Sequence, residues 1–224
     1  MLTNEAKWIG GSLLSLPSDA ASPCLNLGSS TKHYREVVQP FIKQYIVAPA
    51  EACGIRFIHA DIKGAPGVDV VGDIYDAEFQ AHLAALAPAT VLCTNMLEQV
   101  SDPKKLADIC KKLVRPGGHI IVSVPRSFPY HPDPIDTYFR PTPADIANLF
   151  SDCEIVKSEI VSERTYWQEL STLDIQKRLI TILKLGIHLF APFYKWDRWK
   201  ERLHPLLWLF RRYRVSVVVL RRVD

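Results

Sequence analysis

The sequence lacks the features of disulfide-rich, zinc-binding and membrane-spanning proteins. It has only five cysteines among 224 residues, with irregular spacing, no Cys-x-x-Cys pair and no histidine-rich cluster. We therefore expect no disulfide framework, no metal site and a reducing, cytoplasmic compartment. The N-terminus has no basic segment followed by a long apolar core, which argues against a signal peptide. No run of about 18 uncharged apolar residues occurs, so a spanning helix is not expected.

The sequence also lacks a strong charge of either sign. The formal net charge is +3, and 48% of the residues are hydrophobic. This composition is typical of a globular protein, and the mild charge does not favour nucleic-acid binding over the whole surface. The length suits one large domain, or one domain with an appendage.

Short apolar segments alternate with helical patterns along most of the chain. This alternation predicts an α/β fold with a largely parallel sheet. We predict helices at residues 77–86, 102–113 and 142–150, and a helical pattern from about residue 32 that Pro40 weakens. We predict strands at residues 23–27, 55–60, 68–72, 90–94, 119–124, 154–161 and 214–220. The link between the second and third strands is too short for a crossover helix, so the third strand is predicted to be a stub at the sheet edge.

Small and acidic residues follow the first three predicted strands. Gly28 begins a Gly-Ser-Ser-Thr loop before a helix, where free backbone N–H groups favour an anionic ligand, unless the loop is an ordinary turn. Asp61 could accept hydrogen bonds from ribose hydroxyls, or be a solvated loop residue. Asp73 could contact the amino edge of an adenine, or cap a turn. Open parallel sheets bind ligands at this edge, so a nucleotide-type site is predicted there.

The order of these features continues with NMLEQVSDPKKL and with a Pro-Gly-Gly turn before a strand. This order resembles the class I S-adenosylmethionine-dependent methyltransferases, and YHPDPIDTYFRPT resembles a later segment of some of these enzymes. The resemblance covers about residues 23–160 and the final strand. It implies a Rossmann-like, seven-stranded, mostly parallel sheet with an antiparallel last strand, and S-adenosylmethionine bound across the strand ends.

The resemblance also implies which residues bind this cofactor. The loop around Gly28 would line its methionine part, Asp61 would hold the ribose, and the residues after the third and fourth strands would flank the adenine and the sulfonium. The implied cofactor-binding residues are Asn26, Gly28, Ser29, Ser30, Asp61, Ile62, Asp73, Ile74, Asn95 and Met96.

Two regions depart from the family pattern. The family's loop has an acidic residue and three alternating glycines, whereas this chain has Asn26, Ser30 and Lys32 at three of these positions. Gln99 stands where many relatives have a histidine. These departures motivate a second hypothesis, a catalytically inactive methyltransferase-fold protein that docks through its helical insert. A third hypothesis, a dinucleotide-dependent oxidoreductase, is disfavoured because the Gly-x-Gly-x-x-Gly pattern is missing.

The loop of residues 130–140 carries the candidate catalytic residues. In methyl transfer from a sulfonium the protein mainly positions the acceptor, and a base helps only if the acceptor is a hydroxyl or another protonated group. His131 could accept that proton, Asp136 could orient it or bind sugar hydroxyls, and Arg140 could bind a carboxylate or phosphate. The alternative is structural: prolines stiffen this loop, and Asp136 pairs with Arg140 only to hold it in place.

Residues 166–212 form a hydrophobic and basic insert before the last strand, with four of the five tryptophans. Aliphatic residues recur at helical spacing between Leu179 and Phe190, with basic residues nearby. Such helices can lie in a membrane interface, or they can cap the sheet or another subunit. Because the basic residues are embedded among large aliphatic ones, no nucleic acid is expected.

Together these patterns predict one methyltransferase-like domain over residues 1–224, with the helical insert at residues 166–212. The predicted function is methyl transfer from S-adenosylmethionine to a small-molecule or lipid-linked acceptor, with a sugar hydroxyl as the preferred target. The predicted location is the cytoplasm, with contact to the inner face of a membrane through the insert.

Overall fold

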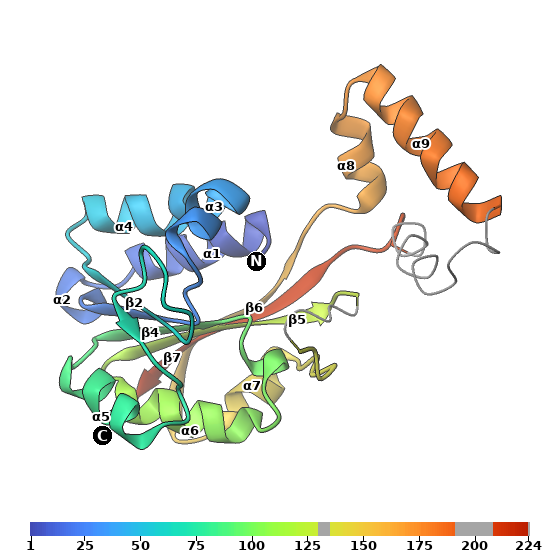
Figure 1. Ribbon diagram of the computed structural model, residues 1–224. Helices are drawn as coiled ribbons and strands as arrows, with labels where there is room; N and C mark the ends of the chain where they lie inside the picture. Colours follow the sequence, from blue (N-terminus) through green and yellow to red (C-terminus); the bar gives the residue numbers. More distant parts are fainter. Residues whose placement is uncertain (130–134, 191–207, 224) are drawn as a thin grey trace.

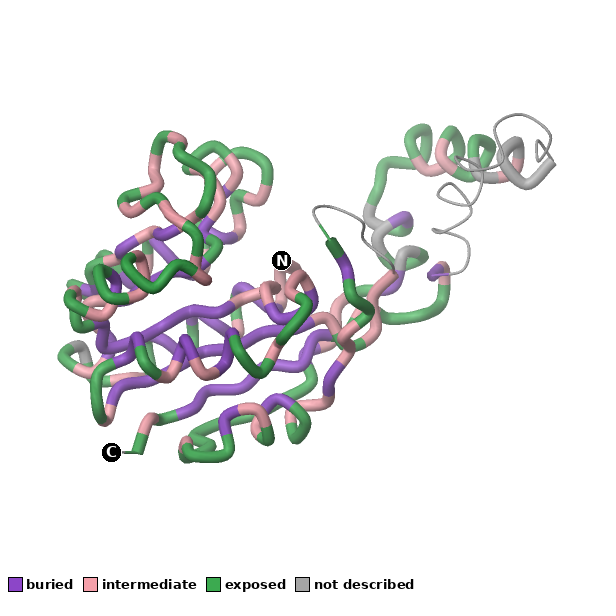
Figure 2. The backbone as a smooth tube through the Cα atoms, turned by 60° about the horizontal axis from the view of Figure 1, so that its bottom comes forward, coloured by how far each residue is buried: buried purple, intermediate pink, exposed green. Residues whose placement is uncertain are grey.

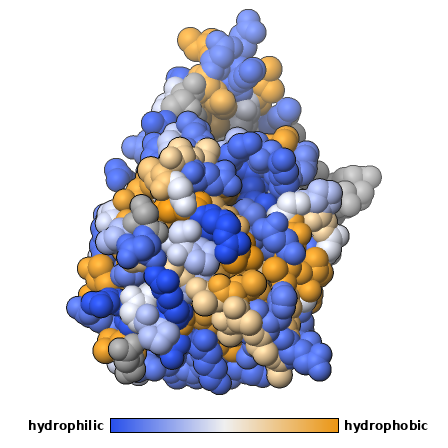
Figure 3. All heavy atoms as spheres, turned by 90° about the vertical axis from the view of Figure 1, so that its left-hand side faces the viewer, coloured by the Kyte–Doolittle hydropathy of each residue, from blue (hydrophilic) through white to orange (hydrophobic). Residues whose placement is uncertain are grey.

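The computed structural model has a central sheet between two layers of helices (Figure 1). It describes residues 1–129, 135–190 and 208–223. Polar side chains are interspersed with apolar ones over the face shown in Figure 3, which is the left-hand side of Figure 1, where α2, α4 and α5 lie.

The described sheet has seven strands in the order β3-β2-β1-β4-β5-β7-β6. Neighbouring strands from β3 to β5 are parallel, and β7 is antiparallel to both β5 and β6. The predicted mostly parallel sheet with an antiparallel last strand is therefore confirmed. The strands are β1 (Cys24–Leu27), β2 (Phe57–Asp61), β3 (Val70–Val71), β4 (Thr90–Thr94), β5 (His119–Ser127), β6 (Cys153–Ser162) and β7 (Arg214–Arg222).

The third strand is the predicted stub at the sheet edge. Only two of its residues pair with β2, with Val70 opposite Ala60 and Val71 opposite Asp61. In contrast, the central strands β1 and β4 are buried over nearly their whole length (Figure 2). Strands covered by helices on both faces have continuous apolar sequences, which is why this part of the sheet was clear from the sequence.

The first helical layer comes from the N-terminal third of the chain. It buries the aliphatic side chains of Ile9 and Leu13 against Leu92 and Ile121 of the sheet. Gly10 allows close packing, because a Cβ atom there would lie 1.8 Å from the carbonyl oxygen of Tyr45. The elements are α1 (Thr3–Leu14), α2 (Ser18–Ala21), η1 (Tyr34–Val38), α3 (Pro40–Ile42), η2 (Lys43–Val47) and α4 (Ala48–Ala52).

Two features of this layer differ from the expectation. Helix α1 was not predicted, because two adjacent glycines interrupt its pattern. The helix expected from about residue 32 is divided into short pieces, and Pro40 occupies the first position of α3, where its missing N–H is tolerated.

The second layer covers the other face with α5 (Ala77–Ala85), α6 (Pro103–Leu113) and α7 (Pro143–Leu149). Asp102 caps α6 by accepting a hydrogen bond from the Lys105 N–H at 2.9 Å, and Pro103 follows it, as predicted. The four residues predicted to form the inner face of α6 are all buried: Leu106, Ile109, Cys110 and Leu113.

The insert begins with α8 (Tyr166–Thr172) and α9 (Ile175–Phe190), which stand apart from the sheet (Figure 1). The predicted helical spacing is confirmed by α9. Five of its aliphatic side chains are exposed in the described part of the helix, including Ile175, Leu179 and Leu183 at 67%, 57% and 64%. No helix among the described residues combines the length and apolar character that crossing a bilayer requires.

Candidate functional site

The carboxyl ends of the parallel strands surround a cavity of about 870 Å³. Twelve of the thirteen residues predicted from the sequence line it, and His131 lies outside the described residues. The structure thus brings together the segments after β1, β2, β3 and β4 and the end of the 130–140 loop. The twelve residues are Asn26, Gly28, Ser29, Ser30, Asp61, Ile62, Asp73, Ile74, Asn95, Met96, Asp136 and Arg140.

The loop after β1 is held open by backbone conformation. Gly28 has φ +59°, and a Cβ atom there would lie 2.9 Å from Sδ of Met96. Ser30 also adopts a positive φ, of 54°. Glycine is thus favoured at the point where the loop approaches Met96 at the end of β4.

Arg35 is buried beneath the loop after β1 and stabilises it through hydrogen bonds. Its guanidinium donates to the carbonyl oxygens of Ser29 and Ser30, at 3.0 and 2.6 Å, and to that of Gly67 at 2.7 Å. Only 5% of Arg35 is exposed, and burial lowers its pKa from the ordinary value while Asp69 acts in the opposite direction. Sequence reasoning missed this residue, since its partners are carbonyl groups that any residue provides.

Asp61 connects the loops after β1 and β2. One carboxylate oxygen accepts the N–H of Ser30 at 2.7 Å, and the other accepts the N–H of Lys63 at 2.9 Å. Each carboxylate oxygen can accept about two hydrogen bonds, so each can accept a further one from a ligand in the cavity.

Asn26 occupies the position that is acidic in the resembled family. Its amide lies 3.3 Å from Nδ1 of His59. Burial, followed by the positive charge of Arg35, lowers the pKa of His59 to about 4, so this ring is neutral at pH 7. A neutral ring can accept a hydrogen bond at Nδ1, which explains how an amide satisfies this position.

Asp73 caps a turn at the cavity wall, which is the structural alternative considered for it. It lines the cavity, and its carboxylate accepts the N–H of Tyr75 at 2.9 Å in a turn. Ile74 also lines the cavity, to which it contributes an apolar side chain.

Glu5 of α1 supports the residue that ends β4. One of its carboxylate oxygens accepts hydrogen bonds from the Asn95 amide and the Ser123 hydroxyl, each at 2.7 Å. The other accepts the backbone N–H of Leu2 at 2.8 Å. Glu5 is fully buried and lines the cavity, and it fixes Asn95, whose φ is +52°. Nothing in the local sequence pattern connects Glu5 to Ser123, which lies 118 residues away.

Glu98 is a second buried carboxyl group on the cavity wall, in the short helix η3 (Leu97–Gln99). It is 5% exposed, and Oε2 has no hydrogen-bond partner among the described residues. Burial raises its pKa to about 8, with a further contribution from the negative charge of Glu5. Glu98 is therefore mostly neutral at pH 7. The sequence motif contains this residue, but only its neighbour Gln99 departs from the family pattern.

Asp136 and Arg140 form a two-point ion pair at the cavity edge. Nη1 of Arg140 is 2.9 Å from Oδ1 of Asp136, and Nη2 is 2.5 Å from Oδ2. Between them, the backbone N–H and hydroxyl of Thr137 donate to the carbonyl oxygen of Glu98, at 2.9 and 3.0 Å. Asp136 and Arg140 thus pair with each other, as the structural alternative predicted. The hydrogen bonds of Thr137 place this loop beside Glu98.

The strand order, the antiparallel β7 and the cavity at the strand ends define the fold of the class I S-adenosylmethionine-dependent methyltransferases, as the sequence predicted. Solved structures agree. A coclaurine N-methyltransferase bound to N-methylheliamine and S-adenosylhomocysteine has a TM-score of 0.55 and 12% identity, covering 97% of this chain and 70% of that chain. The cyclase SpnF has a TM-score of 0.52 and 13% identity, covering 99% and 80%. At these identities the likeness concerns the fold alone.

More particular relatives are ubiquinone biosynthesis O-methyltransferases. The one from Pectobacterium carotovorum is 36% identical over 74 residues, which is 33% of this chain and 30% of the relative. The one from Cupriavidus pinatubonensis is 50% identical over 44 residues, 18% of each chain. The similarity thus spans less than a third of these relatives' length. No established family model matches the chain.

Proposed function

We propose that this protein transfers a methyl group from S-adenosylmethionine to the oxygen of a hydroxyl-bearing acceptor, either a small molecule or a lipid-linked compound. The main support is the single cavity in which the loop around Gly28, the carboxylate of Asp61 and the Asn95–Met96 segment meet. The sequence similarity to O-methyltransferases supports transfer to oxygen.

The cavity residues fit this cofactor. The free capacity of the two Asp61 oxygens suits a pair of ribose hydroxyls, and the absence of a side chain at Gly28 leaves its backbone accessible. A volume of about 870 Å³ is also within the usual range of ligand pockets, roughly 300–1,000 Å³.

When bound, S-adenosylmethionine supplies a methyl group already activated on its sulfonium. The chain has to hold the acceptor oxygen in line and accept its proton. We assign the second task to Glu98, because this residue lines the cavity and its Oε2 atom is buried with no hydrogen-bond partner among the described residues. Its ionised form increases as the pH rises to about 8, so the methylation rate should rise over the same range. His131 remains the second candidate for this role.

Asp136 and Arg140 act in this proposal as positioning residues. Their ion pair shapes the loop that Thr137 ties to the Glu98 carbonyl group. This loop would set the distance between an acceptor hydroxyl and the Glu98 carboxyl group.

Calorimetric titration with S-adenosylhomocysteine tests the cofactor assignment. We expect micromolar binding that Asp61→Ala weakens tenfold or more, a loss of about 1.4 kcal/mol. Asp152→Ala removes an exposed carboxylate that does not line the cavity and should leave binding unchanged. Absence of binding to a folded wild-type protein would refute the assignment. Binding without methyl transfer to any hydroxyl compound in a broad screen would favour the binding-protein hypothesis, which the Asn26 and Gln99 departures motivate.

We also propose that α9 contacts the cytoplasmic face of a membrane. Its exposed aliphatic residues have basic residues close by in sequence, including Lys177 and Lys184. The five cysteines are all free, which supports a cytoplasmic location.

Vesicle flotation tests this contact with the full chain. We expect the protein to float with vesicles of phosphatidylcholine and phosphatidylserine, and Leu179→Ser with Leu183→Ser to abolish flotation. Ile155→Ser with Val156→Ser removes a similarly exposed aliphatic pair from β6 and should have no effect. Equal flotation of both double variants would contradict a role for α9.

A further inference from the structure

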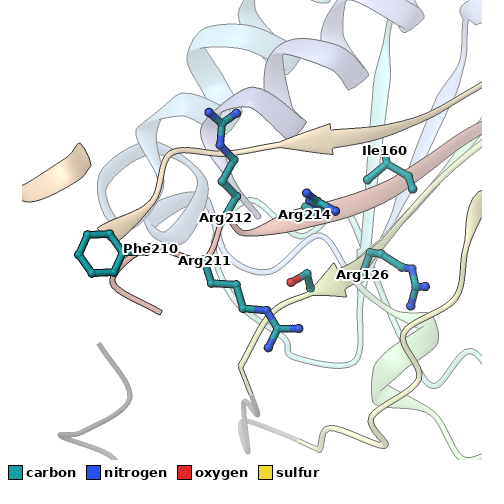
Figure 4. A pocket seen from close by; sticks show the side chains of 7 residues that line it. Arg126, Ile160, Phe210, Arg211, Arg212 and Arg214 are labelled. Atoms are coloured by element: carbon teal, nitrogen blue, oxygen red, sulfur yellow. The ribbon is translucent and has the colours of Figure 1, made fainter. Parts of the chain in front are cut away.

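A second pocket, of about 610 Å³, is bounded by four arginines (Figure 4). It lies where β5 ends and β7 begins, with one residue of β6 in its wall. Its lining residues are Arg126, Ser127, Ile160, Phe210, Arg211, Arg212 and Arg214. None of these residues lines the larger cavity.

The strand pairing explains how two of the arginines meet. Pro125 pairs with Val215 and Ser127 pairs with Arg214, so Arg126 is an extra residue in a β-bulge. A bulge re-aims a side chain, and here Arg126 and Arg214 both line the pocket.

The other two arginines precede β7. The side chains of Arg211 and Arg212 extend in opposite directions from consecutive residues (Figure 4). Arg211 lies over the ring of Trp208, with its guanidinium carbon 4.5 Å from the ring centre, and Trp208 stacks on Tyr213. This aromatic support gives Arg211 a defined position.

The positive charge of this pocket is not balanced by the described part of the chain. No described carboxylate lies within 4 Å of any of the four guanidinium groups. The ion pairs in the described part of the chain all involve other residues. The pKa of Asp145 is lowered mainly by its bonds to Thr142, and Arg126 contributes only the last of the causes. Like charges around one pocket repel one another unless an anion joins them.

We propose that this arginine pocket binds a phosphate or diphosphate group. A guanidinium group offers a planar set of N–H donors that matches the oxygens of a phosphate, and the Ser127 hydroxyl adds a further donor. The pocket is large enough for a diphosphate and part of the group that carries it. In this inference, which rests on the proposed function for the identity of the carrier, the anion belongs to the methyl acceptor.

The position of the pocket suits such an acceptor. Pro125 and Val215 line the larger cavity, whereas the adjacent Arg126 and Arg214 line the arginine pocket. The two pockets therefore adjoin the same end of the β5–β7 ladder. Phe128, just beyond β5, also lines the larger cavity, and in this proposal the acceptor extends around this ladder end from one pocket to the other.

Calorimetric titration of the full chain with inorganic pyrophosphate, at low ionic strength, tests the proposal. We expect saturable binding that Arg126→Gln with Arg214→Gln weakens tenfold or more. The control, Arg56→Gln with Arg221→Gln, removes the same charge from exposed positions outside the pocket and should change affinity less than twofold. No binding by the wild type, or equal losses in both double variants, would overturn the proposal.

Arg126 also donates a hydrogen bond to the Arg140 carbonyl oxygen at 2.8 Å, so the double variant could lose affinity through misfolding. A third variant therefore tests the pocket without changing the strands. Arg211→Gln changes an exposed residue outside the strands, and it should weaken pyrophosphate binding at least threefold. Unchanged binding in this variant would exclude Arg211 and contradict the pocket as proposed.

Vesicles distinguish the two sources of a phosphate group. In the Leu179→Ser/Leu183→Ser background, which removes the proposed α9 contact, flotation with phosphatidylcholine vesicles containing phosphatidic acid that is lost when Arg126→Gln and Arg214→Gln are added would identify a lipid headgroup. Pyrophosphate binding without such arginine-dependent flotation would identify a phosphate on a soluble molecule. Both results support the pocket, and they differ only in the carrier.

The outcome is separable from that of the cofactor assignment. The Arg126/Arg214 double variant should bind S-adenosylhomocysteine like the wild type. If S-adenosylhomocysteine binds but pyrophosphate does not, the arginine pocket fails alone. If pyrophosphate binds and S-adenosylhomocysteine does not, the methyltransferase assignment fails while the anion site stands.

Discussion

Replacing Glu98 by glutamine should change how the stability of the protein depends on pH. The folded protein holds the Glu98 carboxyl group with a pKa of about 8, compared with an ordinary value of 4.5. Below pH 4.5 the group is neutral in both the folded and unfolded chains, so its contribution to stability is fully present. As the pH rises toward 8 the unfolded chain releases this proton and the folded chain retains it, so stability falls.

The size of this effect follows from the pKa difference. A change from 4.5 to about 8 corresponds to about 5 kcal/mol of unfolding free energy over the whole titration, at about 1.4 kcal/mol per pH unit. Between pH 5 and pH 8 the share is about 3.5 kcal/mol. The Glu98→Gln variant cannot ionise, so relative to the wild type it should gain about this amount between those two pH values.

Urea unfolding followed by far-ultraviolet circular dichroism at pH 5, 6, 7 and 8 measures the difference. Glu51→Gln is the matched control, since it makes the same chemical change at an exposed position and should parallel the wild type at every pH. If Glu98→Gln also parallels the wild type within about 0.5 kcal/mol, an error typical of such comparisons, the carboxyl group is ionised and solvated and the reasoning from burial is wrong.

Three further predictions concern the cavity wall and use the same unfolding assay. Gly28→Ala should destabilise the protein by about 1–2 kcal/mol because Gly28 has a positive φ. The control Gly11→Ala, in open space within α1, should stabilise the protein by about 0.5–1 kcal/mol. Equal effects of the two substitutions would refute the conformational argument. Arg35→Lys should lower the free energy of unfolding by about 2–3 kcal/mol and weaken S-adenosylhomocysteine binding, because an ammonium cannot reach three carbonyl groups. Wild-type stability and binding in this variant would show that the loop after β1 does not need the hydrogen bonds of Arg35. Arg140→Ala should cost about 3–5 kcal/mol by removing the guanidinium partner of the buried Asp136 carboxylate. Asp136→Asn added to it should recover part of that loss, whereas additive losses would contradict the pair.

The sequence was sufficient for those parts of the fold that depend on local pattern. Strand β4 was predicted at its observed bounds, and the Asp102–Pro103 start of α6 was read correctly, because burial on both faces and helix capping leave clear local signals. The position of Asp61 at the cavity was accessible to sequence reasoning because the apolar strand β2 ends at this residue.

The residues that were missed depend on distant contacts. Glu5 acts through Asn95 and Ser123, which are 90 and 118 residues away, and α1 itself has a weak pattern because of its glycines. The bulge at Arg126 arises only from pairing with β7, so the arginine pocket has no signature in the segment around it. Glu98 shows the opposite case, since its motif was found but its burial came from tertiary packing.

The most direct test of the central claim is a crystal structure of the protein grown with S-adenosylhomocysteine. We predict that the ribose hydroxyls lie within hydrogen-bond distance of the Asp61 carboxylate, with the adenine beside Asp73 and Ile74 and the sulfur beside Asn95 and Met96. A ligand bound elsewhere, or an empty cavity at saturating concentration, would contradict the account.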